Sequence, residues 1–456
     1  MKPFILFLCL TLALLTGCER DTAQPQQIPE KPLQQAPVAT DGPIGREPAV
    51  APAAEIEDIR PEFAAVRLLH DPAETILVEL PTAALPFWRQ KKESAPALVL
   101  LSQDPLLAPI PPALEQEVLQ LLHDGTDAEI LTRTAKPVAD PLLLPSMAVS
   151  AAQRARLFSQ VIWILPSKQA AEQLDLEIFL GQMLDLGAID SAEADSFNET
   201  GLGMFAGVVG GLPFQAVHLD ALPELTRPVV VHFDPSFLKP LYRGEIKTPL
   251  YPLLAELLGK LRDRNWQTVG ASVSRSSLNG SIPLPSRFVS VDVARLFEEP
   301  RLFEADMPRT WDLRARALYL ENFLKKEEVR ELYEEMEART PEDPSVKYAL
   351  YQVLRQFKEV NAAMVKLDEA VRLDPVYALE YLSLAEIANE KNLVDQVERM
   401  LRLAVSAMPD HPFLQLRLAG YLQTTGQDEE AEKLLTKLRE KPWSPVYYPD
   451  MVKQLD

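Results

Sequence analysis

The residues best suited to chemistry stand at the end of one apolar run. Val229-Val230-Val231-His232-Phe233-Asp234-Pro235-Ser236 has the pattern of a buried strand that ends in polar side chains. Residues two apart on a strand share a face, so His232, Asp234 and Ser236 can point into one cleft. Open α/β sheets bind ligands where such strands end. A histidine beside a carboxylate is a typical ligand pair for Zn²⁺ and other transition ions.

A second His-x-Asp pair, His218 and Asp220, precedes this strand. Only about eight residues, Asp220 to Arg227, separate the two flanking strands. A parallel crossover needs at least roughly ten to twelve residues, so the spacing predicts antiparallel neighbours. The two pairs would then lie at opposite ends of the sheet and would not form one metal site.

A further motif, Ser290-Val291-Asp292-Val293-Ala294, adds a third acidic residue. Together with His232-Phe233-Asp234 it partly resembles the arginase and histone-deacetylase-like metallohydrolases, whose ligands lie at strand ends in Asp-x-His and Ser-x-Asp-x-Asp patterns. Here the first pattern is reversed, and Ala294 stands at the position of the second acid. The resemblance implies a Zn²⁺ or Mn²⁺ site at His232, Asp234 and Asp292, and hydrolysis of C–N bonds.

The elements that would position these residues occupy about residues 55–305. Short apolar runs alternate there with helical segments, which predicts an α/β domain with a mixed sheet and covering helices. Continuous runs such as Ala97–Leu101 are typical of strands buried on both faces. The candidate strands are Thr75–Leu80, Ala97–Leu101, Val161–Leu165, Gln215–Leu219, Val229–Phe233, Thr268–Val273 and Phe288–Val293, and the candidate helices are Pro112–His123, Ala151–Ser159, Ala170–Leu186 and Leu250–Arg264.

Other catalytic motifs are incomplete. Gly201-Leu202-Gly203-Met204-Phe205-Ala206-Gly207 lacks the G-x-G-x-x-G spacing of a dinucleotide site. Close backbone packing or a loop explains its glycines better, and the stretch through Val217 is predicted to be a buried turn. Because no catalytic set is complete, the sequence favours a non-catalytic protein without a cofactor, with the hydrolase as the alternative.

The last third of the chain has a repeating pattern. Pro375 and Pro409 are 34 residues apart, and small residues recur between them where paired helices would cross closely. The pattern resembles tetratricopeptide repeats, which have this period, and implies helix pairs over about residues 309–441. The preceding copy reads about three residues short. The best-matching positions are Leu384, Ala385, Ala388, Leu401 and Ala404, followed by Leu418, Ala419, Gly426, Ala431 and Leu435.

Tetratricopeptide arrays line a concave groove with the first helix of each pair, so the resemblance implies a binding surface. Aromatic side chains with a few polar groups are typical of protein interfaces. A lysine-rich carboxylate clamp is missing, and the expected ligand is an apolar or mixed peptide segment. The alternative is that the groove packs against the chain's own α/β domain. The groove positions are Tyr348, Tyr351, Arg355, Leu382, Glu386, Asn389, Phe413 and Gln423.

Residues 442–456 form an aromatic tail after the repeats, with Trp443, Tyr447 and Tyr448 among prolines. A solenoid must cover the apolar face of its final helix, so we expect this tail to cap the array. A tail that docks a partner is the alternative.

The start of the chain has the pattern of a targeting signal. Lys2 precedes an apolar run from Phe4 to Leu15, which is shorter than the roughly 20 residues that span a bilayer. The run ends in Leu15-Thr16-Gly17-Cys18, which resembles the lipobox of bacterial lipoproteins. The resemblance implies removal of residues 1–17, acylation of Cys18 with chains such as palmitate and, because Glu19 is not aspartate, an outer-membrane location. Residues 18–54 are rich in proline and glutamine and are predicted to be an extended linker.

Composition narrows the class of partner. The net charge of −20 argues against nucleic acid, whose phosphates attract lysine and arginine patches. The two cysteines are Cys9, inside the predicted signal, and Cys18, so no disulfide is expected. The sequence therefore predicts a lipid-anchored envelope protein, facing the periplasm or the cell surface. Its expected role is to bind another envelope protein or peptide segment as a scaffold.

Overall fold

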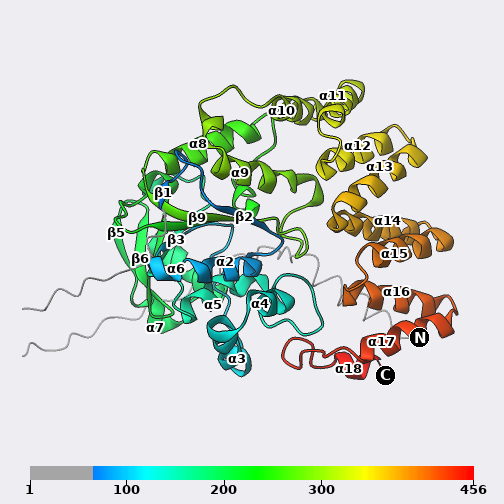
Figure 1. The fold of residues 1–456 in the computed structure, drawn as a ribbon, viewed down its shortest axis with the longest axis horizontal. Helices are drawn as coiled ribbons and strands as arrows, with labels where there is room; N and C mark the ends of the chain where they lie inside the picture. The colour runs from blue at the N-terminus through cyan, green and yellow to red at the C-terminus, as the bar shows by residue number, and fades with distance from the viewer. Residues whose placement is uncertain (1–64, 456) are drawn as a thin grey trace, which may run out of the picture. The chain divides into compact units, whose positions relative to one another are not determined.

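The computed structural model describes residues 65–455, so Cys18 and the predicted signal and linker lie outside the described residues. The described residues belong to one compact unit. An α/β domain comes first and an all-helical region follows (Figure 1), which confirms the predicted fold class. Within residues 65–455, no helix is both long enough and apolar enough to cross a bilayer.

A mixed sheet of nine strands lies at the centre of the α/β domain, in the order β1-β9-β8-β3-β4-β7-β6-β5, with β2 also paired to β9. Strands β2, β9, β8, β3, β4 and β7 pair in parallel, whereas β1 pairs antiparallel with β9 and the β5–β6 and β6–β7 pairs are antiparallel. The strands are β1 Val66–Arg67, β2 Thr75–Val78, β3 Ala97–Leu101, β4 Gln160–Ile164, β5 Asn198–Gly201, β6 Met204–Val209, β7 Leu212–Val217, β8 Val229–Phe233 and β9 Gln267–Ser274.

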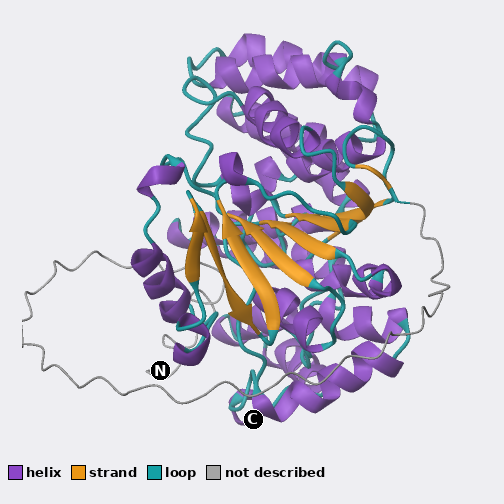
Figure 2. Ribbon diagram, turned by 90° about the vertical axis from the view of Figure 1, so that its left-hand side faces the viewer, coloured by secondary structure: helices purple, strands orange, loops and turns teal. Residues whose placement is uncertain are grey.

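Helices cover both faces of this sheet (Figure 2). Side chains alternate along a strand, so Leu98 and Leu100 pack against helices α2 to α6 while Val99 and Leu101 pack against α8 and α9. Burial on both faces explains why the central strands are continuous apolar runs. The helices are α2 Leu85–Gln90, α3 Pro112–Asp124, α4 Asp127–Thr134, α5 Ala148–Arg154, α6 Leu176–Asp185, α7 Ser191–Ala194, α8 Leu250–Arg262 and α9 Phe288–Glu298.

Two predicted strands coincide with β3 and β8 residue for residue, but the predicted strand Phe288–Val293 is wrong. Those residues begin helix α9. Val289, Val293 and Phe297 recur at intervals of four and are buried on one face of the helix. The short run fits both the strand period and the helix period, and its continuation to Phe297 decides for the helix.

The predicted antiparallel pairing around residues 220–227 is also wrong. Strands β7 and β8 both belong to the parallel part of the sheet, and β3 and β4 lie between them. The connection contains only the short 3-10 turn Leu219–Ala221. An extended chain covers about 3.3 Å or more per residue, so this connection can return to the opposite edge of the sheet without a crossover helix.

Residues 198–217 form the strands β5, β6 and β7 rather than the predicted buried turn. Gly203, Gly210 and Gly211 take positive φ angles of 68°, 59° and 74° in the two tight connections. Gly207 lies inside β6, where an added Cβ would approach the Phe197 ring to 2.5 Å. Its close packing confirms that the glycines of this stretch serve the backbone.

This contact gives a first prediction. Gly207→Ala forces a methyl group into the Phe197 ring, and we expect a loss of about 1–3 kcal/mol in the free energy of unfolding. The control is Gly181→Ala in α6, where an added Cβ meets nothing within 4 Å. That change should stabilise by about 0.5–1 kcal/mol because alanine favours a helix over glycine. Equal urea midpoints for the two variants would contradict the packing.

The helical region contains four successive helix pairs. In the turn inside each pair, Leu324, Lys358, Asn392 and Gly426 take positive φ angles, at a constant interval of 34 residues. This interval equals the spacing of Pro375 and Pro409, and the copy that reads three residues short in sequence has the full period. The helices are α10 Arg309–Glu321, α11 Lys326–Arg339, α12 Pro344–Gln356, α13 Val360–Leu373, α14 Leu379–Glu390, α15 Val394–Ala407, α16 Pro412–Thr424 and α17 Asp428–Arg439, followed by the short α18 Met451–Leu455.

Candidate functional site

Asp234 lies at the carboxyl end of β8 and is almost completely buried. Its Oδ1 accepts a hydrogen bond from the backbone N–H of Ser236 at 2.8 Å, and its Oδ2 accepts from the hydroxyls of Ser274, at 2.5 Å, and Ser276. The Ser236 hydroxyl accepts from the backbone N–H of Gln103 at 3.1 Å. Both carboxylate oxygens are therefore engaged within the chain, and they join the end of β8 to the end of β9.

His232 is fully buried in the layer below Asp234. Its Nδ1 lies 2.9 Å from the Ser272 hydroxyl oxygen, which accepts a hydrogen bond from the Trp88 indole at 3.0 Å. The Trp88 and His232 rings meet edge to face at 5.3 Å. Burial lowers the pKa of His232 to about 4, so the imidazole is neutral at neutral pH. This histidine belongs to the core and does not open into a cleft.

The serines that hold these two residues were not singled out from sequence. Ser272, Ser274 and Ser276 alternate along the end of β9, and this period of two is the signal that places them on one face. Sequence reasoning identified the polar end of β8 but had no means of placing β9 beside it.

His218 and Asp220 serve a local turn. The Nδ1 of His218 accepts from the backbone N–H of Asp220 at 3.1 Å, which caps the turn Leu219–Ala221. The Asp220 carboxylate lies 2.6 Å from the Lys260 ammonium, and this hydrogen bond lowers the pKa of Asp220. His218 lies at the same edge of the sheet as Asp234, but strands β3 and β4 separate the two.

Asp292 has different neighbours from His232 and Asp234. It lies on α9, and its Oδ2 accepts a hydrogen bond from the Tyr251 hydroxyl at 2.8 Å. The three residues assigned to Zn²⁺ or Mn²⁺ are thus not brought together around one point. Across residues 65–455, no group of three or more histidine, cysteine, aspartate and glutamate side chains is arranged to hold a metal ion.

Arg314 of α10 forms the centre of a buried junction between the α/β domain and the helix pairs. Its Nη2 donates to the Ser345 hydroxyl at 2.9 Å and lies 3.3 Å from Asp343 Oδ2. The guanidinium also stacks over the Phe288 ring at 4.2 Å. Arg314 stabilises the ionised form of Asp292, but burial is the stronger effect and raises the pKa of Asp292 to about 6.

A second prediction follows from this pKa. The folded-state pKa of Asp292 is about 6 against a reference of 3.8, so the folded chain binds a proton where the unfolded chain does not. We expect stability from this group to rise as pH falls from about 7 through 6 and to level off below about 4, by roughly 2–3 kcal/mol. Asp292→Asn should remove this contribution in urea unfolding between pH 4 and 8.

The comparison is the difference between the wild-type and variant curves, because the other titrating groups are common to both. Asp312→Asn, on a half-exposed side of α10, is the matched control and should leave the pH profile parallel to that of the wild type. A parallel profile for Asp292→Asn would show that Asp292 titrates as an ordinary carboxyl.

A second group of buried charges joins β2, β9, α9 and the segment before α14. Arg287 is 2% exposed, and its guanidinium donates to Asp374 at 2.8 Å and to Glu79 at 2.6 Å. Arg275 donates to the same two carboxylates at 3.3 and 3.1 Å. The α/β domain is therefore fixed to the third helix pair as well as to the first.

Half of the predicted groove is buried. Tyr348 and Tyr351 donate their hydroxyl protons to Glu380 at 2.6 and 2.7 Å, and Arg355 donates to the same carboxylate at 2.8 Å. Leu284 of the α/β domain packs against the apolar cluster that contains these tyrosines. These aromatic side chains are engaged inside the chain, as the alternative interpretation of the groove expects.

The remaining groove positions are divided. Leu382 is buried, and Glu386 accepts a hydrogen bond from Arg417 at 2.5 Å. Asn389 and Gln423 are exposed. These exposed positions do not include the aromatic anchors that the groove hypothesis requires.

Phe413 packs against the C-terminal tail, with ring distances of 5.8 Å to Trp443 and 5.3 Å to Tyr448. The Trp443 indole donates to the carbonyl of Leu438, the last turn of α17, at 2.7 Å. The backbone N–H of Ser444 donates to a carbonyl of the α/β domain, that of Ala139, at 3.0 Å. The tail thus covers the final helix pair and joins it to the first domain.

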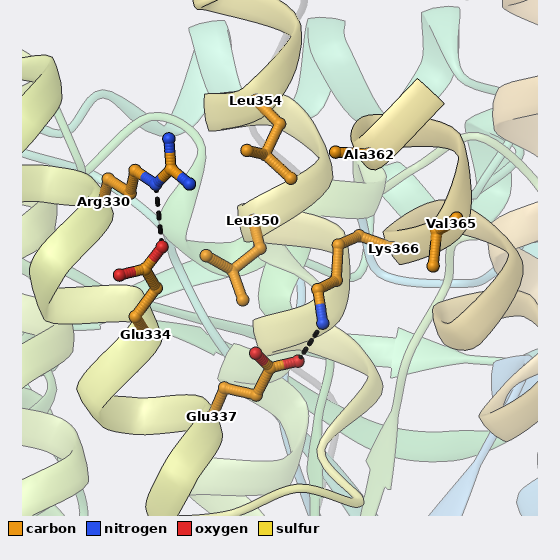
Figure 3. Close-up of a pocket in the computed structure, with 8 residues that line it drawn as sticks. All are labelled: Arg330, Glu334, Glu337, Leu350, Leu354, Ala362, Val365 and Lys366. Atoms are coloured by element: carbon orange, nitrogen blue, oxygen red, sulfur yellow. Dashed lines mark hydrogen bonds and ion pairs between the residues drawn. The ribbon is translucent and has the colours of Figure 1, made fainter. Parts of the chain in front are cut away.

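A hollow of about 360 Å³ lies on the helical region between α11 and α13 (Figure 3), and we call it the α11–α13 hollow. Leu350 and Leu354 of α12 form its floor, and Ala362 and Val365 of α13 form one wall. Its charged rim is paired: Arg330 donates to Glu334 at 2.7 Å and Lys366 to Glu337 at 2.7 Å. Sequence reasoning missed this surface because it considered only the first helix of each pair. The lining is Arg330, Glu334, Glu337, Leu350, Leu354, Ala362, Val365 and Lys366.

Comparison with known proteins supplies no family for this chain. No protein-family model matches its sequence, and no curated protein matches it at a significant level. The function is therefore argued from the geometry of the described residues.

Proposed function

We propose that this chain is a lipid-anchored envelope protein that binds another protein or peptide through its helical region. The observation that carries the proposal is the α11–α13 hollow, an apolar surface with a paired rim that no other part of the described chain fills. The filled concave positions around Tyr348 and Phe413 move the proposed contact to this outer face.

The chemistry of the hollow defines the side chain that it would accept. A volume of about 360 Å³ lies at the small end of ligand sites, which span roughly 300–1,000 Å³. Leu350 and Leu354 offer apolar contact, and Val365 is 55% exposed beside them. Because the rim charges neutralise one another, an uncharged aliphatic or aromatic side chain of a partner segment fits better than a charged one.

A photo-crosslinking residue at position 365 of the full chain, in the membranes of its native host, tests this contact. We expect a discrete protein adduct that is lost when Ala362→Trp fills the hollow. The control is Gln396→Trp, which places the same bulk at the equivalent position 34 residues later, on α15. An adduct that survives Ala362→Trp, or no adduct at all, would overturn the proposal.

The anchor is tested separately. Cys18→Ser should move the protein from the membrane fraction to the soluble fraction, and the mass of the wild-type protein extracted by detergent should include acyl chains. Wild-type protein that begins at Met1 without acyl chains would contradict lipidation. The hydrolase alternative is not proposed, because Asp234 is engaged by three donors and Asp292 lies elsewhere.

A further inference from the structure

The turns inside the first three helix pairs expose apolar side chains. Leu324 is 76% exposed in the first turn, Val360 is 63% exposed at the second, and Val394 is 53% exposed at the third. Phe323 and Leu393 are also exposed beside them. We call these five residues the turn edge.

The helix-pair architecture does not require these residues. In the fourth turn the equivalent positions of Phe323 and Leu324 are Thr425 and Gly426. Leu324 has a φ of 55°, a left-handed conformation that costs a bulky residue about 1–2 kcal/mol and that Gly426 adopts without this cost. A leucine that is strained and exposed stabilises neither the turn nor the core, so its retention points to a contact outside the chain.

The turns lie along one side of the array. Turns at a constant interval in stacked repeats fall on the same face. Contacts between neighbouring turns agree: Arg330 near the first turn lies over the Phe357 ring of the second at 5.7 Å, and the Tyr421 hydroxyl near the fourth donates to the Val394 carbonyl of the third at 2.8 Å.

Lysines accompany the apolar residues. Lys326, Lys358 and Lys391 stand at the first, second and third turns, and none of them makes an ion pair within the described part of the chain. The nearest acidic residues already have partners. Glu328 pairs with Lys325 at 3.3 Å in the first turn.

At the second turn, Glu359 pairs with Arg330 at 2.9 Å. The turn edge therefore combines protruding apolar side chains with unpaired positive charges. In a chain of net charge −20, this is a side that an anionic surface would attract rather than repel.

We propose that the turn edge rests on an anionic lipid bilayer. The proposal rests on the proposed lipid anchor, which would hold the chain beside a membrane. Single apolar side chains at separate turns match a fluid surface, which needs no complementary pockets, and lysines at the same level reach headgroup phosphates. Each buried lysine charge near such a surface contributes favourably, and insertion of the apolar tips adds to it.

Site-specific fluorescence on the lipidated full chain tests this contact. The sequence has no cysteine other than Cys9 and Cys18, so Phe323→Cys introduces a single thiol for an environment-sensitive dye. In vesicles of phosphatidylethanolamine and phosphatidylglycerol we expect blue-shifted emission that a lipid-borne quencher reduces. Thr425→Cys, the equivalent position of the fourth turn, is the matched control and should show neither effect.

Reversing the three lysines in Lys326→Glu/Lys358→Glu/Lys391→Glu should reduce the shift, and vesicles of phosphatidylcholine alone should reduce it as well. Identical spectra for the labels at 323 and 425 would overturn the proposal. So would a blue shift that depends on protein density and not on lipid, which would assign the edge to a second copy of the chain. Failure of the anchor is distinguished by the wild-type protein, because an unacylated Cys18 would itself take the dye.

Discussion

Replacing Arg287 by alanine is expected to lower the free energy of unfolding by about 3–5 kcal/mol. Arg287 is 2% exposed and joins Glu79 of the α/β domain to Asp374 of the helical region. Its removal leaves both carboxylates with Arg275 as their one remaining guanidinium partner in this cluster. Breaking one side of a buried ion pair costs far more than the pair contributes, because a desolvated charge remains.

Urea unfolding of the purified chain measures this effect, and limited proteolysis between α9 and α10 reports loosening of the junction. Arg309→Ala is the control, because Arg309 pairs with Glu335 on the surface, where such pairs contribute little. If both variants unfold at the same urea concentration, the Glu79–Arg275–Arg287–Asp374 cluster does not hold the two regions together.

Trp443→Ala should have a comparable effect, a loss of about 3–5 kcal/mol, because a large buried aromatic side chain is removed. The indole covers Phe413 and donates to the Leu438 carbonyl, so its loss exposes the end of the last helix pair. We expect a lower thermal midpoint and faster hydrogen exchange in α16 and α17 than in α12 and α13.

Phe323→Ala removes an exposed aromatic side chain from the same region and should leave the midpoint nearly unchanged. Wild-type stability in the Trp443→Ala variant, together with unchanged exchange in α16 and α17, would favour the alternative that residues 442–456 serve a partner and not the array.

Local patterns were reliable where one period was unambiguous. Ala97–Leu101 and Val229–Phe233 are uninterrupted apolar runs of strand length between turn residues, and both are strands as predicted. The interval between Pro375 and Pro409 also recurs in the backbone, from Leu324 to Gly426. These features follow from the residues themselves, because apolar spacing selects an element whatever surrounds it.

Predictions failed where the outcome depended on distant segments. Residues 288–293 form a helix because the run continues to Phe297 against the sheet. The strands on either side of residues 220–227 are not neighbours because β3 and β4 pair between them. Asp234 was singled out as a ligand, but the serines of β9 that engage its oxygens are about 40 residues away in sequence.

The sequence by itself determined the class of this protein: an α/β domain, a helical array of 34-residue period and a first segment that resembles a lipoprotein signal. Only the tertiary structure decided which polar residues remain free to act. His232, Asp234 and Tyr348 carry the chemistry expected of sites, yet each is buried and satisfied or enclosed by its neighbours. The physical reason is that periodicity sets local elements, whereas burial and hydrogen bonding depend on which distant elements pack together.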